Sequence, residues 1–147
     1  NKTILILDKK DVPLSMIAET IRKHDANNYV INMVRSPKDA RFYYDENPDR
    51  MFSVSIRKPE VFHSYMEAGI PKTQMFACIG TEKDEGTEAL CKILAENGIR
   101  YLMATASSYD KIKDHKERIQ TYRKIIETGV TIIESNYPVE LKNALNN

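Results

Sequence analysis

The sequence has few of the features that mark specialised classes of protein. Only two of its 147 residues are cysteine, Cys78 and Cys91, which match no metal or redox motif and make no disulfide scaffold, so we expect buried free thiols. No apolar run approaches the roughly 20 residues of a membrane span, and no charged-then-apolar leader is present. The formal net charge of +1 gives no electrostatic basis for binding nucleic acid or an anionic membrane surface.

Linkers are absent as well. No Gly/Ser-rich stretch, low-complexity tract or shift in composition divides the chain, so we expect one domain over residues 1–147. This length is well below the roughly 250 residues of a typical (β/α)8 barrel, which means that a barrel would be incomplete. Asn1 stands where a native chain would have Met, and we expect the N-terminus to have been processed, cut or designed.

What the sequence does contain is a regular alternation of short apolar runs and amphipathic helical stretches. Each run is too short for a buried helix, is rich in Ile, Val, Phe and Tyr, and is followed by a polar turn, which is typical of parallel β/α units. Consecutive parallel units are adjacent and right-handed, so the pattern predicts one curved α/β sheet with helices outside and two open edges. The six runs are 4–7, 29–34, 51–56, 75–79, 99–103 and 130–133.

Prolines and capping residues predict where the helices between these strands begin. Four aromatic side chains, Tyr43, Tyr44, Phe62 and Tyr65, are expected to pack against the sheet. The predicted helix starts are Pro13, Ser36-Pro37, Pro59, Thr87 as a cap, a fifth helix over about 109–128, and Pro138.

Parallel β/α folds carry their chemistry at the C-terminal ends of the strands, and there the first run is followed by Asp8 and Lys10. Their spacing puts both side chains on one face. The Asp8 carboxylate suits Mg²⁺ or Ca²⁺, although these cations need several oxygen ligands, and Lys10 could neutralise a phosphate. The alternative is a solvated turn in which the two residues pair with each other.

The other strand ends form a polar, hydrogen-bonding rim, with two arginines able to bind an anion. No pair of nucleophile and base emerges from it. The three histidines, His24, His63 and His115, lie in or beside predicted helices and are therefore expected on the outer layer. The rim residues that could contact a ligand are Arg35, Arg57, Thr105 and Asn136.

Three segments resemble one enzyme family in their order and spacing. Residues 129–141 read Gly-Val-Thr-Ile-Ile-Glu-Ser-Asn-Tyr-Pro-Val-Glu-Leu, residues 6–10 read Ile-Leu-Asp-Lys-Lys, and residues 97–105 read Asn-Gly-Ile-Arg-Tyr-Leu-Met-Ala-Thr. They resemble the eighth, third and seventh strands of glycerophosphodiester phosphodiesterases, whose closing motif is roughly Gly-Val-Asp-Ile-Ile-x-Thr-Asp-x-Pro. The resemblance implies an incomplete TIM (β/α)8 barrel that holds six of eight strands and lacks the two N-terminal βα units.

The resemblance also implies roles for a few residues. Asp8 matches the third acidic metal ligand of the family, and Lys10 matches the lysine that holds the substrate phosphate. Ala104 stands where many members have a tryptophan, while Ser135 and Asn136 replace the usual Thr-Asp pair. The family's His-Arg-Gly motif, its other two acidic ligands and its second catalytic histidine have no counterpart here.

Family chemistry is metal-assisted hydrolysis, in which Ca²⁺ or Mg²⁺ acts on a glycerophosphodiester to release an alcohol and glycerol phosphate. Our leading interpretation is therefore the C-terminal three quarters of such a metal-dependent phosphoric diester hydrolase, inactive by itself and able to dimerise through its open sheet edges. A second interpretation is a degenerate, non-catalytic domain that binds a phosphorylated ligand or a protein partner. A third is an unrelated open β/α domain.

Overall fold

The computed structural model describes residues 3–82 and 84–146, so Asn1 lies outside the described residues. Six parallel strands form one sheet in chain order, as predicted: β1 (Leu5–Asp8), β2 (Val30–Val34), β3 (Met51–Ser55), β4 (Met75–Gly80), β5 (Tyr101–Ala104) and β6 (Ile132–Glu134). Between and after them lie α1 (Leu14–Lys23), α2 (Pro37–Glu46), α3 (Pro59–Glu67), α4 (Glu85–Glu96), α5 (His115–Glu127) and α6 (Pro138–Asn146), with short 3₁₀ helices η1 (Lys72–Gln74) and η2 (Tyr109–Lys111).

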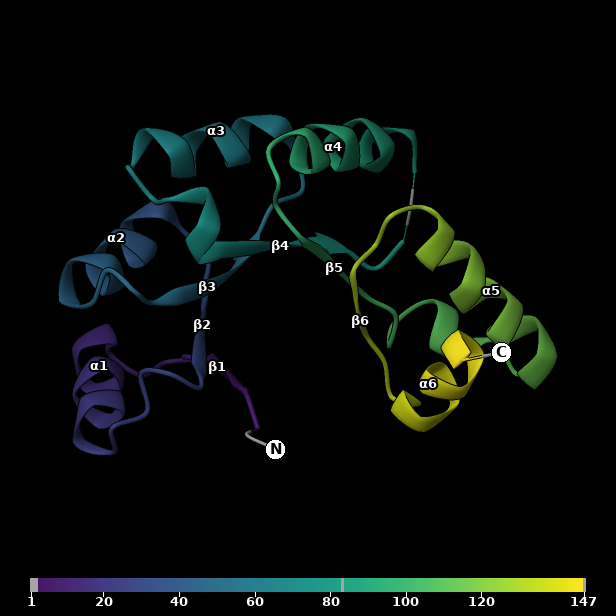
Figure 1. Cartoon of the computed structure of the whole chain (residues 1–147), viewed down its shortest axis with the longest axis horizontal. Coiled ribbons are helices and arrows are strands. Elements are labelled where there is room, and N and C mark those ends of the chain that lie inside the picture. The colour runs from purple at the N-terminus through teal and green to yellow at the C-terminus, as the bar shows by residue number, and fades with distance from the viewer. Residues whose placement is uncertain (1–2, 83, 147) are drawn as a thin grey trace.

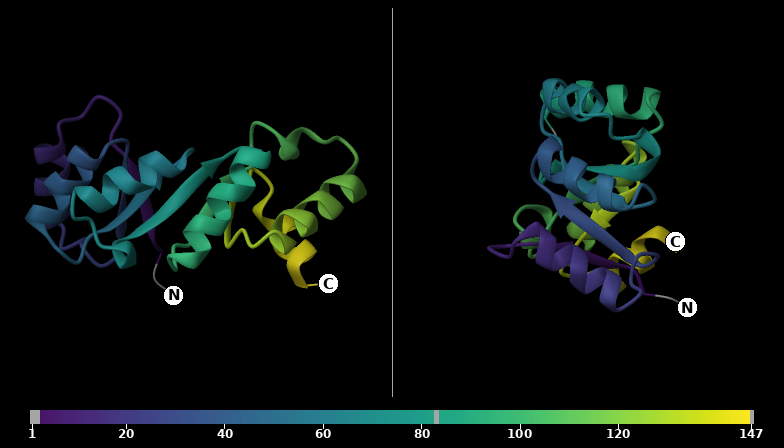
Figure 2. Two further views of the ribbon diagram at one scale, coloured as in Figure 1. Left: turned by 90° about the horizontal axis from the view of Figure 1, so that it is seen from above. Right: turned by 90° about the vertical axis from the view of Figure 1, so that its left-hand side faces the viewer.

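The sheet curves into an arc with the helices on its outer side, and the arc is open between β1 and β6 (Figures 1 and 2). Every neighbouring pair is parallel, with registers such as Asp8 beside Met33 and Leu102 beside Ile132. Among the described residues, β1 pairs only with β2 and β6 only with β5. The expected half-closed barrel of parallel β/α units is therefore confirmed.

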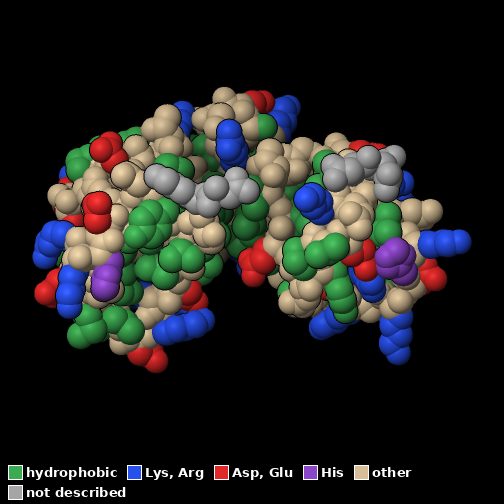
Figure 3. Space-filling model, turned by 60° about the horizontal axis from the view of Figure 1, so that its bottom comes forward, with side chains coloured by type: hydrophobic (Ala, Val, Ile, Leu, Met, Phe, Trp, Pro, Cys, Tyr) green, Lys and Arg blue, Asp and Glu red, His purple; other side chains and the backbone are tan. Residues whose placement is uncertain are grey.

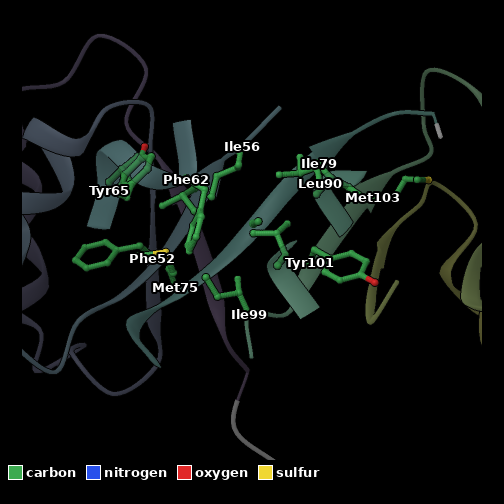
Figure 4. Close-up of a cluster of buried hydrophobic side chains, with 14 of the residues drawn as sticks. Phe52, Ile56, Phe62, Tyr65, Met75, Ile79, Leu90, Ile99, Tyr101 and Met103 are labelled. Atoms are coloured by element: carbon green, nitrogen blue, oxygen red, sulfur yellow. The ribbon is translucent and has the colours of Figure 1, made fainter. Parts of the chain in front are cut away.

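The main hydrophobic core lies between the outer face of the sheet and the helices. Phe52 and Val54 of β3 are fully buried beneath Phe62 and Tyr65 of α3, and Figure 4 shows this cluster continuing across β4 and β5. Burial of such side chains contributes about 1.5–3 kcal/mol each. The expectation that the aromatics pack against the sheet is confirmed for Tyr43, Phe62 and Tyr65, which are buried, and for Tyr44, which packs on the same core half-buried.

The inner face of the sheet is largely apolar, and Figures 1 and 2 show no helix over it among the described residues, although Phe76 and Leu102 are buried there. Ile31, Met51, Phe76 and Ile132 alternate with the strand residues of the outer core and line a cavity of about 450 Å³ near the N-terminal ends of the strands. Figure 3 shows hydrophobic side chains gathered along the hollow between the two ends of the arc. This face is what a closed barrel would fill with further side chains.

Two helix starts differ from the sequence prediction. The fourth helix is capped by Asp84, not by Thr87, because the Asp84 carboxylate accepts the backbone N–H of Thr87 at 2.7 Å. The fifth helix begins at His115 rather than at 109, because Asp114 caps it and the chain before it forms η2 and an extended residue, Ile112. The second helix opens at Ser36-Pro37 as predicted, and the structure shows that Ser36 caps it by accepting the N–H of Asp39 at 3.1 Å.

Two smaller observations complete the description of the fold. Within the described part of the chain, no helix has the length and apolar character needed to cross a bilayer. Cys91 is buried in α4 and Cys78 is half-buried in β4, and neither forms a disulfide within the described residues.

Candidate functional site at the C-terminal rim

The first group of polar residues at the C-terminal rim is the Asp8 cluster, formed by Asp8, Lys10 and Arg35. Asp8 is the last residue of β1, and Lys10 adopts a left-handed backbone with φ of 46°, from which its Nζ donates to Asp8 Oδ2 at 2.5 Å. Arg35 follows β2 directly and donates from Nη2 to Asp8 Oδ1 at 3.3 Å. The parallel pairing of β1 with β2 therefore places two cations on one carboxylate.

Electrostatics stabilise the ionised form of Asp8. The hydrogen bond from Lys10 lowers the pKa of the carboxyl below its usual value, and the charges of Lys10 and Arg35 act in the same direction while partial burial opposes them. The Lys10 and Arg35 side chains are 74% and 64% exposed, so solvent screens both ion pairs. The cluster can therefore exchange these partners for a ligand at small cost.

The second group is the Asp110 cluster, which is buried. Asp110 lies in η2, is only 5% exposed, and accepts hydrogen bonds from Thr105 Oγ1 at 2.6 Å and Tyr122 Oη at 2.8 Å. Ser135 Oγ, at 3.1 Å, and the backbone N–H of Asn136, at 2.6 Å, donate to the same carboxylate. These donors come from the ends of β5 and β6 and from α5, so one side chain joins three elements.

Burial raises the pKa of the Asp110 carboxyl, but the four hydrogen bonds to it outweigh burial and leave its pKa below the usual value. Burial also raises the pKa of Tyr122 to about 12, so its hydroxyl stays protonated and donates. The cluster is thus a set of neutral donors around one buried anion. Its geometry serves to hold the loops after β5 and β6 together.

The structure places the remaining predicted rim residues in different surroundings. Thr105 is fully buried and bound to Asp110, so its side chain supports the loop and does not face a ligand. Asn136 is exposed and lines a cavity. Arg57 lies against Gly80, where an added Cβ would come within 2.7 Å of its Nη1, and lines a separate cavity of about 490 Å³.

Within residues 3–82 and 84–146, no hydrogen bond or ion pair joins the Asp8 cluster to Arg57 or to the Asp110 cluster. The rim therefore consists of separate groups on one edge of the sheet. Asp110 did not emerge as a rim residue from the sequence, because the pattern placed it inside a helix. The only signal for it is its position in a polar segment directly after the fifth strand.

The described residues do not fit a complete divalent cation site. No three His, Cys, Asp or Glu side chains in the described ranges gather closely enough to hold a metal ion. Asp8 could supply one oxygen ligand, whereas Ca²⁺ and Mg²⁺ take six or more, and the Lys10 ammonium already occupies this carboxylate. The role of metal ligand stays a prediction for Asp8, and no group of metal-binding side chains gathers around it among the described residues.

The histidines lie on the helical layer, as predicted. His24 follows the last turn of α1, His63 lies within α3, and His115 is the first residue of α5, where its Nε2 is 3.4 Å from Glu140 Oε2. None of them contacts the Asp8 cluster in the part of the chain that the structure describes. Acid–base chemistry at Asp8 therefore has no histidine within this chain.

The fold and the rim together define a class of protein: an open arc of the parallel (β/α)8 type with polar and basic side chains at the C-terminal ends of its strands. Comparison with known proteins then narrows this class. The chain is similar to a solved structure of a glycerophosphoryl diester phosphodiesterase from Parabacteroides distasonis, with a TM-score of 0.94 and 38% identity over 99% of this chain. The resemblance to glycerophosphodiester phosphodiesterases indicated by the sequence motifs is thereby confirmed.

The similarity extends over nearly all of this chain but over only part of the Parabacteroides protein. The similarity covers 51% of the Parabacteroides protein, so the chain spans about half the length of that relative. No protein-family model and no curated protein matches the chain. Identity of 38% along nearly the whole chain does not agree with the third interpretation, an unrelated open β/α domain.

Proposed function

We propose that this chain forms part of a metal-dependent phosphodiester hydrolase that converts glycerophosphodiesters to an alcohol and glycerol phosphate. The observation that carries the proposal is the Asp8 cluster, because it presents a carboxylate and two cations at the C-terminal end of β1 in a fold similar to the Parabacteroides enzyme. In the proposed enzyme, Lys10 binds the phosphate and Asp8 is one ligand of a Ca²⁺ or Mg²⁺ ion. A divalent cation supplies charge stabilisation of the phosphodiester when bound.

The geometry of the cluster suggests how a phosphodiester would bind. Lys10 is a compact cation on a flexible stem that is 74% exposed, so its Nζ can leave Asp8 and meet a phosphate oxygen. Arg35 is able to bind the same anion through its guanidinium. The exchange costs little because the exposed ion pairs that it replaces contribute about 0–1 kcal/mol each.

A binding experiment tests this assignment. Titration of the labelled chain with glycerophosphocholine, followed by amide chemical shifts, should move the signals of Asp8, Lys10 and Arg35. Lys10→Ala should weaken this binding about tenfold, a loss of about 1.4 kcal/mol. The matched control is Lys23→Ala, an exposed lysine at the end of α1. Equal affinity of the Lys10→Ala variant and the unchanged chain would contradict the proposed phosphate site.

The same chain is expected to show no phosphodiesterase activity by itself, since it offers one candidate metal ligand and no histidine at the cluster. The purified chain is assayed on glycerophosphocholine with added Ca²⁺ or Mg²⁺. Turnover that disappears in Asp8→Ala would show that a complete site is present and would overturn this part of the proposal.

A second candidate function is a non-catalytic domain that binds a phosphorylated ligand or a protein partner. The contacts of Asp8 favour this candidate, because Lys10 and Arg35 already donate to the carboxylate oxygens that a metal ion would need. Divalent cations separate the two candidates in the titration. If Asp8 serves as a metal ligand, Ca²⁺ strengthens glycerophosphocholine binding and Asp8→Asn removes this effect, whereas affinity independent of Ca²⁺ supports the non-catalytic domain.

We also propose that the chain forms a homodimer through its open sheet edges. Next to the free edge of β1, Ile4, Leu5 and Ile6 are 53%, 46% and 47% exposed, a row of apolar side chains that monomers usually cover. Light scattering over a range of concentrations tests the proposal. A stable monomer at high concentration would contradict it.

A further inference from the structure

A second cavity on the C-terminal rim lies away from the Asp8 cluster and is lined by residues of the loops that follow β5 and β6. Figure 1 shows β5 and β6 toward the end of the arc opposite β1. Its volume is about 550 Å³. Lys111 and Lys113 line it from one side, Asn136 and Tyr137 from the other, and Arg118 of α5 borders it as well. No motif in the sequence analysis pointed to these two lysines.

The walls of this cavity are held in place by buried polar contacts. Arg118 donates from Nε and Nη2 to the two carboxylate oxygens of Glu140 at 2.6 and 2.8 Å, and from Nη1 to the carbonyl of Ile112 at 2.6 Å. The ring of Tyr137 lies over the same guanidinium, 4.3 Å from its carbon to the ring centre. The Asp110 cluster fixes the other ends of both loops. A ligand would therefore meet a site that is already formed, which lowers the entropy cost of binding.

The charge left over in the cavity is positive. Arg118 and Glu140 neutralise each other, and neutral donors occupy the carboxylate of Asp110, which also lines the cavity and keeps its negative charge. The positive charges of Lys111 and Lys113 outnumber this one carboxylate. Lys111 and Lys113 are exposed, and neither forms an ion pair with any residue that the structure describes. The cavity at Arg57 contains two carboxylates, those of Glu82 and Asp84, whereas this cavity contains one, that of Asp110.

The position of the cavity in the fold favours a phosphate ligand. In (β/α)8 barrels, a phosphate site is frequently built from the loops that follow the seventh and eighth strands. The sequence motifs align β5 and β6 with these two strands. Two lysines that line the same cavity suit a dianion better than a monoanion, because each contributes a separate point charge.

We propose that this cavity binds a phosphate monoester, with Lys111 and Lys113 on the phosphate and Tyr137 as the wall against which the organic group packs. A phosphate monoester carries a charge of about −1.5 to −2 at pH 7. The site is independent of the Asp8 cluster and does not rest on the function proposed above. It adds a second anion site on the same rim.

Phenyl phosphate is the probe for this site. Amide chemical shifts of the labelled chain should respond at Lys111, Asn136 and Tyr137 during the titration. The double variant Lys111→Ala/Lys113→Ala should weaken binding at least about tenfold. Because both lysines are exposed, the variant should keep the melting temperature of the unchanged chain. The matched control removes the same charge from α5, where Lys116 and Lys124 are exposed outside the cavity.

Two comparisons decide the outcome. Phenyl sulfate has the shape of phenyl phosphate but a single charge, and it should bind more weakly; equal affinity would overturn the assignment to a dianion. Binding at this cavity is fitted from the signals of Lys111, Asn136 and Tyr137 alone, and any binding at the Asp8 cluster is followed separately from the signals of Asp8, Lys10 and Arg35, which keeps the two tests apart. Equal affinity in the Lys111→Ala/Lys113→Ala and Lys116→Ala/Lys124→Ala variants would show only non-specific attraction and would remove the proposed site.

Discussion

Asp8 and Asp110 lie on the same rim, and in both the pKa of the carboxyl is below its usual value, yet their surroundings are opposite. Asp8 is held by two exposed cations, whereas Asp110 is held inside the protein by three hydroxyl groups and one backbone N–H. Because the Lys10 and Arg35 side chains are exposed, they have room to turn from Asp8 to a ligand. The buried donors around Asp110 cannot turn to a ligand in this way. The Asp110 carboxylate therefore holds the loops of the rim in place but does not itself bind a ligand.

The largest expected effect is on stability when Asp110 loses its charge. Asp110→Asn keeps the shape but replaces an acceptor oxygen with an N–H₂ group that faces hydrogen-bond donors, so we expect the free energy of unfolding to fall by about 2–4 kcal/mol. Asp8→Asn, the matched change in the exposed cluster, should cost no more than about 1 kcal/mol. Urea unfolding at pH 7 measures both. Equal losses would show that the two carboxylates do not differ as described.

The contribution of the Asp110 charge to the free energy of unfolding should also depend on pH. A depressed pKa means that the stability contributed by ionised Asp110 is fully present above its unfolded pKa of about 3.9 and is lost as the pH falls through the folded value. The stability gap between the unchanged chain and Asp110→Asn should therefore be constant above about pH 5 and shrink below about pH 4. Unfolding curves from pH 6 to pH 2.5 test this. A gap that widened in acid would contradict the sign of the shift.

A smaller effect is expected from the hydroxyl of Tyr122. Tyr122→Phe removes one donor at 2.8 Å from Asp110 while the ring remains buried, so we expect a loss of about 1 kcal/mol. Tyr44→Phe is the control, because Tyr44 is half-buried and its hydroxyl has no hydrogen-bond partner among the described residues. If Tyr44→Phe lowered the free energy of unfolding as much as Tyr122→Phe, the loss at Tyr122 could not be assigned to its hydrogen bond with Asp110.

The smallest expected effect is the change that added salt makes to the stability loss of the Asp8→Asn variant. At 1 M ionic strength the Debye length is about 3 Å, so the exposed ion pairs of Asp8 should be screened and the small cost of Asp8→Asn should approach zero. The cost of Asp110→Asn should stay nearly the same, because its partners are neutral and buried. Repeating the urea experiment with and without salt measures both responses. A salt-sensitive Asp110→Asn variant would argue against a buried cluster of neutral donors.

Local signals were enough to predict much of the architecture. Runs of β-branched and aromatic residues, each followed by a turn and an amphipathic stretch, predicted six strands in the observed order. Ser36-Pro37 predicted the start of the second helix, which the structure confirms. Asp8 and Lys10 were predicted to lie together because they are two residues apart at the end of a strand. Their contact therefore depends on local backbone geometry and not on long-range packing. The cap at Asp84 was missed, since Thr87 offers a competing cap three residues later.

What the sequence by itself determined is therefore the alternation of strands and helices, their order, and the rim on which Asp8, Arg57 and Asn136 lie, because these follow from periodicity and from the geometry of parallel β/α units. Only the tertiary structure decided what surrounds Asp110 and the cavity beside it. Its donors, Thr105, Tyr122, Ser135 and Asn136, are separated from it by 5 to 26 positions in the chain. They meet because β5 and β6 pair in parallel and α5 packs over them, and that long-range packing leaves no periodic trace in the sequence.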